Sequence, residues 1–98
     1  MKVLLVTYQL VPVRPVVSLI TELQNSPHWW HFFDYTWLIG TNETADELYG
    51  RVSRHLTAAD RELIVELRRG VEYQGWLTKE AWDWINERLA LPNYYPYR

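Results

Sequence analysis

Two histidines and an aspartate recur at every third position in the segment HWWHFFDYTW, residues 28–37. His28, His31 and Asp34 are residue types that bind divalent metals, and the surrounding aromatic rings could stack on nucleic-acid bases. Aromatic and β-branched residues favour a strand, however, and side chains three positions apart on a strand point to opposite faces. We therefore expect no metal site here. We expect the rings to form core or an interface, with base stacking as the alternative.

Other side chains that could do chemistry are scattered along the chain. Ser18 and Ser53 fall in predicted helices and lack the glycine-flanked turn of a nucleophile elbow. The four glycines form no phosphate-binding loop. The acidic residues near the C-terminus alternate with basic ones, which is typical of a solvated helix face. No catalytic residue and no cofactor are predicted from these patterns.

Composition limits the class of protein. The chain has 98 residues, of which 48% are apolar, enough for one domain with one modest core. It has no cysteine, which excludes a disulfide framework and agrees with a cytoplasmic location. The apolar run after Lys2 is too short to span a membrane, so we expect no membrane association. The net charge of −2 argues against a free-standing nucleic-acid binder, although arginines could still cluster after folding.

The first half of the chain predicts a strand, a helix and a hairpin. The β-branched run at 2–10 predicts a buried strand. Prolines then precede a helical apolar stripe at 15–24. Strands at 29–33 and 36–40 follow, joined by a tight turn at Asp34-Tyr35.

The second half predicts two helices separated by one strand. A capping box of Thr44 and Glu47 opens a helix within 42–56. The strand at 61–67 has a core of Leu63, Ile64, Val65 and Leu67, and Thr78 caps a helix at 79–89. The resulting order is that of an α+β, ferredoxin-like βαββαβ fold with an additional C-terminal helix and an extended tail. We expect one domain over residues 1–90 and a tail over 91–98.

Three stretches carry a family resemblance: MKVLLVTYQL, WWHFFDYTWLI and GWLTKEAWDWINERL. They resemble small bacterial proteins labelled SinR-family. Those proteins are similar to the ferredoxin-like CRISPR-associated small protein that partners the spacer integrase. The resemblance implies the same fold and a homodimer.

The same resemblance bears on nuclease chemistry. In that family the first strand ends in Tyr-Asp, whereas this chain has Tyr8-Gln9. A neutral amide cannot supply the charge that holds Mg²⁺ for a nuclease reaction. We therefore expect a homodimer that binds a protein or nucleic-acid partner without nuclease activity. The alternative is a Mg²⁺-dependent endonuclease of RNA or DNA that uses other carboxylates such as Asp34 or Asp60.

Two groups of residues are candidates for contacts. The candidates for nucleic-acid or partner contact flank the end of the first strand or form a short cationic step, and they are Tyr8, Gln9, Arg14, Arg68 and Arg69. The candidates for a dimer or partner surface are large rings, and they are Trp30, Tyr35, Trp37, Trp84, Tyr94 and Tyr95.

Overall fold

A computed structural model describes residues 1–70, 72 and 75–89 of the chain. Four strands and three α-helices follow one another with one short 3₁₀ segment, η1. In chain order they are β1 (Lys2–Gln9), α1 (Val17–Gln24), β2 (His28–Phe33), β3 (Thr36–Thr41), α2 (Ala45–Val52), η1 (Ser53–His55), β4 (Arg61–Leu67) and α3 (Lys79–Leu89).

The strands form one antiparallel sheet in the order β2-β3-β1-β4. Leu5 of β1 lies opposite Leu38 of β3 on one side and opposite Val65 of β4 on the other. β4 is an edge strand among the described residues. A small four-stranded antiparallel sheet with three helices is consistent with a ferredoxin-like α+β fold.

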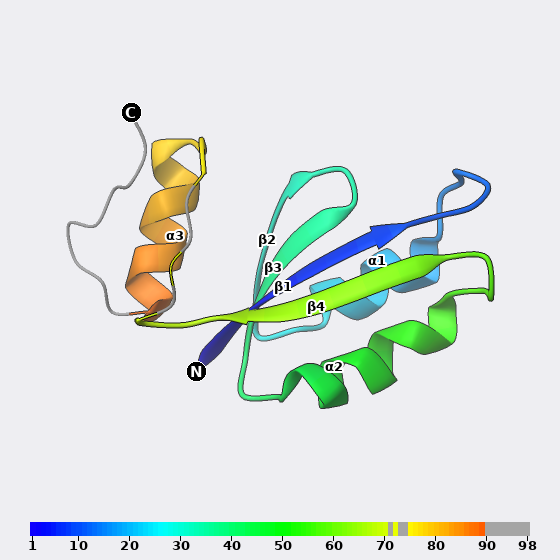
Figure 1. The fold of residues 1–98 in the computed structure, drawn as a ribbon, viewed down its shortest axis with the longest axis horizontal. Helices are drawn as coiled ribbons and strands as arrows, with labels where there is room; N and C mark the ends of the chain where they lie inside the picture. Colours follow the sequence, from blue (N-terminus) through cyan, green and yellow to red (C-terminus); the bar gives the residue numbers. More distant parts are fainter. Residues whose placement is uncertain (71, 73–74, 90–98) are drawn as a thin grey trace.

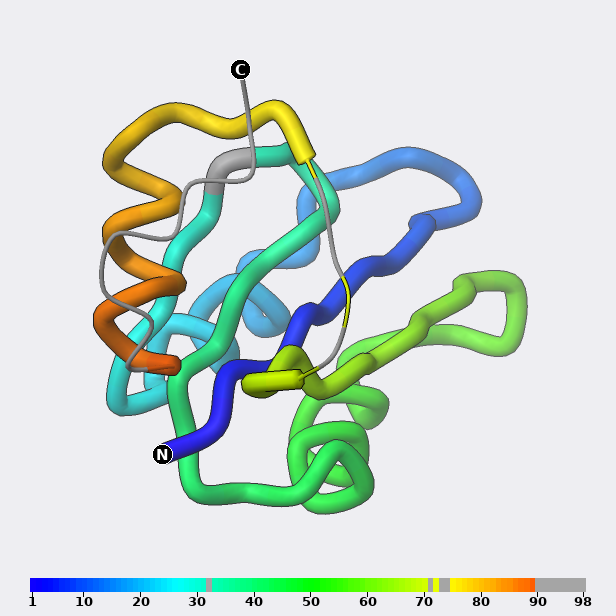
Figure 2. Tube along the Cα trace, turned by 60° about the vertical axis from the view of Figure 1, so that its left-hand side comes forward, coloured from blue at the N-terminus to red at the C-terminus, as the bar shows by residue number. Residues whose placement is uncertain are grey.

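Helices cover both faces of the sheet, as Figures 1 and 2 show. On the first face, alternate residues of β1 pack with α1 and α2, and the cluster includes Leu4, Val6, Leu19, Leu23, Leu48 and Val52. On the second face, Val3 and Leu38 pack with Trp82, Ile85 and Leu89 of α3. α1 and α2 therefore cover one face of the sheet, and α3 lies on the opposite face near the start of β1.

Local signals explain where the elements begin and end. The hairpin turn at Asp34-Tyr35 is confirmed, with a bulge in β2 between His31 and Phe33. The capping box is also confirmed, because the Thr44 hydroxyl accepts from the Glu47 amide at 3.1 Å and the Glu47 carboxylate accepts from the Thr44 amide at 2.9 Å. The helix after Pro15 begins only at Val17.

The predicted strand at 61–67 and helix at 79–89 are confirmed with the same bounds. The second predicted helix ends earlier, at Val52, and continues as η1. The predicted tail at 91–98 and the domain boundary at 90 lie outside the described residues. In the described part of the chain, no helix has the length and hydropathy needed to cross a membrane.

Candidate functional site

The end of β1 brings three of the predicted contact residues together. The hydroxyl of buried Tyr8 accepts a hydrogen bond from the indole N–H of Trp37 at 3.2 Å. Its ring meets Tyr35 edge-on, with the centroids 5.7 Å apart. Tyr8, Tyr35, Arg14 and Asp34 contribute to the lining of a groove of about 420 Å³. The hairpin turn and the loop after β1 thus lie on either side of Tyr8.

Arg14 and Asp60 are engaged with each other. The guanidinium of Arg14 donates to both oxygens of Asp60, at 3.1 and 2.8 Å. Asp60 also accepts from the backbone amides of Val11 and Thr57, at 2.9 and 2.8 Å. The hydrogen bond from Arg14, with these amides, holds the pKa of Asp60 well below its usual range. The pair therefore anchors the loop after β1, which weighs against a phosphate contact at Arg14 and a metal ligand at Asp60.

The remaining polar candidates lie elsewhere. Gln9 is exposed at the last position of β1, and its side chain points to the opposite face from Tyr8. Arg68 and Arg69 are exposed just after β4. Because β4 runs antiparallel to β1, they lie at the other end of the sheet. The structure does not bring the predicted contact residues into one surface.

The predicted ring surface needs correction. Trp37 is fully buried, so it belongs to the core and not to a surface of the folded chain. Trp30 and Trp84 are half-buried and pack against the cluster under α3. Tyr35 remains 37% exposed at the hairpin turn. The other two predicted rings, Tyr94 and Tyr95, lie outside the described residues.

The side chains of His28, His31 and Asp34, whose types and spacing could suit a metal ion, do not converge on one point. The ring of His31 stacks on Trp37 with the centroids 3.9 Å apart, and its Nε2 lies 3.1 Å from the carbonyl oxygen of Asp34. His28 instead lies beside Arg88, with 3.4 Å between its Nδ1 and the guanidinium. Among the described residues, no three His, Asp or Glu side chains are grouped so that they could hold a metal ion.

An apolar area remains uncovered beside α3. We call it the open face, and it consists of Leu5, Thr7, Leu63 and Val65 on the sheet face that carries α3. Leu63 is 60% exposed and Val65 is 44% exposed. Both belong to the apolar middle of the predicted strand 61–67, and they remain exposed because α3 packs over only one end of this face, where Val3 and Leu38 lie.

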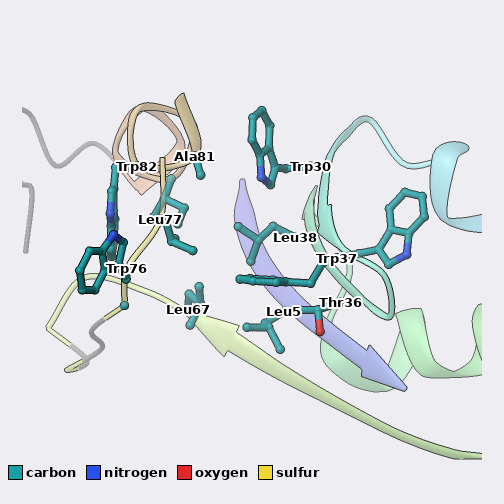
Figure 3. A pocket seen from close by; sticks show the side chains of 13 residues that line it. Leu5, Trp30, Thr36, Trp37, Leu38, Leu67, Trp76, Leu77, Ala81 and Trp82 are labelled. Carbon is teal, nitrogen blue, oxygen red and sulfur yellow. The ribbon is translucent and has the colours of Figure 1, made fainter. Parts of the chain in front are cut away.

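An apolar groove of about 290 Å³ runs between α3 and the sheet, next to the open face. Figure 3 shows Leu77 and Ala81 on one side of it and Trp30 and Leu38 on the other. Trp76, which is 86% exposed, also lines the groove. The second face of the sheet therefore carries exposed apolar residues beside this apolar groove.

β4 turns its more acidic side toward α1 and α2 and leaves apolar residues exposed on its other side. On one side Glu62, Ile64 and Glu66 are partly buried, whereas Leu63 and Val65 on the other side are exposed. Leu67, at the end of that other side, is partly buried against the cluster under α3. Ile64 packs against the cluster under α1 and α2, so the acidic side of the strand faces those helices. The alternation was visible in the sequence RELIVEL, but which side faces outward depends on the register with β1.

The orientation of β4 leaves Glu62 in an unfavourable place. Both carboxylate oxygens of Glu62 are buried and have no hydrogen-bond partner among the described residues. Burial raises the pKa of Glu62 to about 7. β4 thus buries a carboxyl on one side and exposes a leucine and a valine on the other.

Comparisons with protein-family models, with curated proteins and with solved structures find no match to this chain.

Proposed function

We propose that this chain is a ferredoxin-like, homodimeric interaction protein and that two copies meet through the open face and the edge of β4. The observation that carries the proposal is the orientation of β4, which exposes Leu63 and Val65 and partly buries two acids. Large apolar side chains on an exposed edge strand invite pairing with another chain. A partner that covers them would offset the unfavourable position of Glu62.

A second copy is the partner that symmetry favours. A two-fold axis places the same patch of both subunits in contact, so an edge strand meets itself in antiparallel orientation. The outer N–H and C=O groups of β4 would then extend the sheet across the interface. Such pairing leaves the open faces of both copies on the same side of the joined sheet, where Leu63 of one copy packs beside Val65 of the other near the axis. The family resemblance, which implies a homodimer, agrees with this arrangement.

Such a dimer would also gather positive charge. If the β4 strands pair about Ile64, Arg61 of one copy lies opposite Leu67 of the other, next to the Arg68 and Arg69 that follow it, because the two strands run in opposite directions. Two basic clusters would form at the ends of the interface, although the chain as a whole carries a net charge of −2. Arginine clusters of this kind bind phosphate groups. We therefore expect a nucleic-acid partner for the dimer, bound without the nuclease reaction that the amide of Gln9 disfavours.

The test is the molar mass of the protein in solution, measured by light scattering after size-exclusion chromatography. We expect the wild-type chain to be a dimer and the variants Leu63→Lys and Val65→Lys to be folded monomers, because a charge on the open face prevents its burial. The matched control is Tyr49→Lys, which changes a 51% exposed ring on the outer side of α2 and should leave the dimer intact. A wild-type monomer, or dimers of both open-face variants, would refute the proposal.

A further inference from the structure

A serine, a histidine and a glutamate form a hydrogen-bonded chain where α1 meets η1. The Oγ atom of Ser18 lies 3.0 Å from Nδ1 of His55, and Nε2 of His55 lies 3.1 Å from Oε1 of Glu22. Ser18 and Glu22 are four residues apart on α1 and therefore share one side of the helix. This is the order of groups that activates a serine nucleophile: hydroxyl, base and orienting carboxylate.

Glu22 is held in its ionised form. The guanidinium of Arg54 donates to it at 2.6 Å and that of Arg51 at 3.1 Å. The hydrogen bond from Arg54, followed by the one from His55, lowers the pKa of Glu22 to about 2. A permanent carboxylate accepts the Nε2–H of His55, which leaves the lone pair of Nδ1 facing the hydroxyl of Ser18. The network thus selects the tautomer in which His55 can take a proton from the serine.

Backbone donors lie next to the serine. The amides of Leu19 and Ile20 donate to the carbonyl of Val16, at 3.1 and 3.2 Å. The amides of Val17 and Ser18 come before them in the first turn of α1 and have no acceptor within the helix. Val16 makes no side-chain cap on these amides. Donors at the positive end of a helix can stabilise the oxyanion that forms when a serine attacks a carbonyl.

We infer that Ser18 is the nucleophile of a second site, which hydrolyses small carboxylic esters. Ser18 Oγ bonds to the acyl carbon while its proton passes to Nδ1 of His55. The bond from that carbon to the alkoxy oxygen then breaks, and His55 returns the proton to the leaving alcohol. Water, deprotonated by His55, adds to the acyl carbon and releases the carboxylic acid and free Ser18. Glu22 is a positioning residue, since it acts through His55.

The site is accessible and separate from the proposed dimer surface. Ser18 is exposed, whereas the side chains of His55 and Glu22 are only 17% and 12% exposed. A small substrate can therefore reach the hydroxyl from solvent while the base remains shielded. α1 covers the first face of the sheet, and the open face lies on the second. Monomeric open-face variants should therefore keep this reactivity, so the two proposals can fail independently.

The decisive experiment labels the full-length protein with a fluorophosphonate probe and maps the modified residue by mass spectrometry. We expect labelling at Ser18. Hydrolysis of p-nitrophenyl acetate should fall about a hundredfold in Ser18→Ala and His55→Ala, the size of a general-base contribution. The matched control is Ser53→Ala, because Ser53 lies nearby but outside the hydrogen-bonded chain. This variant should keep both the labelling at Ser18 and the hydrolysis of p-nitrophenyl acetate. No labelling of the folded wild-type protein, or unchanged hydrolysis by Ser18→Ala, would overturn the inference.

A further variant tests whether Glu22 positions His55 or only holds the helices together. Glu22→Gln keeps the shape of the side chain but removes the carboxylate that lies 3.1 Å from Nε2 of His55. We expect slower hydrolysis and a displaced pH–rate profile, with Arg51 and Arg54 as the remaining charged groups around the ring. A profile that stays in place would show that Glu22 only holds the helices together and would contradict its positioning role.

Discussion

Replacing Glu62 with glutamine is expected to stabilise the fold above neutral pH and to change little in mild acid. Both carboxylate oxygens of Glu62 are buried without a hydrogen-bond partner among the described residues. Tyr8 lies directly opposite on β1, and Ile64 follows on the same side of β4. Glutamine has nearly the same shape as glutamate but carries no charge, so the substitution isolates the effect of burying the ionised form.

The sign follows from the raised pKa of Glu62. In the unfolded chain the carboxyl ionises above its ordinary pKa of 4.5, whereas in the folded chain it ionises only above about 7. The native state therefore binds an extra proton in this interval, and its free energy of unfolding falls as the pH rises from 4.5 through about 7. The glutamine variant loses this dependence.

The size of the effect can be worked out from the same pKa. A pKa difference of one corresponds to about 1.4 kcal/mol. The rise from 4.5 to about 7 thus sets an upper limit of about 3 kcal/mol. Part of the Glu62 residue reaches solvent, which screens the charge, so we expect a gain of about 2 kcal/mol at pH values above 7.

Urea unfolding, followed by tryptophan fluorescence at several pH values from about 5 to about 8, measures this gain. The comparison between variant and wild type removes every pH-dependent contribution that both proteins share. The acids Glu22, Glu43 and Asp60 have lowered pKa values, so the stability that they contribute is lost only in stronger acid.

Glu66→Gln is the matched control, because Glu66 lies on the same side of β4 four residues further along. It should not reproduce the pH-dependent gain. Equal stabilisation by Glu62→Gln at both ends of the pH range, or no stabilisation above pH 7, would refute the assignment of a buried charge to Glu62.

Two further predictions concern a basic residue and a helix cap. Arg68→Gln should weaken binding of single-stranded nucleic acid, measured by fluorescence anisotropy, and reduce the salt slope by about 1, because one phosphate contact is lost; an equal effect of Lys79→Gln on α3 would contradict this. Thr44→Ala should lower the free energy of urea unfolding by about 1 kcal/mol, because it removes the cap on the Glu47 amide. The exposed Thr21→Ala on α1 is its control, and equal losses would show that the cap has no special effect.

The elements that local chemistry defines could be predicted from the sequence. The capping box of Thr44 needs only residues within one helical turn. The turn at Asp34-Tyr35 needs only a break between two aromatic strands, and the structure has it at that position. The helix at 79–89 follows from its own apolar stripe and its preceding threonine. Each of these signals acts between neighbours in the chain, where spacing alone specifies geometry.

The candidate sites depend on contacts between distant residues. Ser18 was dismissed as a nucleophile because no local motif surrounds it, yet His55 reaches it from 37 positions away. The i, i+4 spacing of Ser18 and Glu22 was the one sequence signal that a shared partner could lie there. Trp37 was expected on a surface, but its ring is covered by His31 and by Trp29, whose centroid is 5.4 Å away.

The register of β4 connects its buried acid with its exposed apolar residues. A slip by one residue against β1 would turn every side chain to the other face. Glu62 would reach solvent, and Leu63 and Val65 would face α1 and α2 in exchange for Ile64, while Leu67 would lose its contact with the cluster under α3. For an isolated chain this alternative would solvate a carboxyl and bury two apolar side chains that are now exposed, and both changes would stabilise it.

The folded chain has the other register, and the proposed dimer, in which the apolar residues of the open face pack across the interface, would compensate for its cost. The molar mass of the lysine variants and the stability of Glu62→Gln therefore test the same explanation. If Leu63→Lys yields a folded monomer and Glu62→Gln stabilises the protein above pH 7, the orientation of β4 is explained by association. If the lysine variants remain dimeric, β4 is turned outward for another reason, and the interface lies elsewhere on the chain.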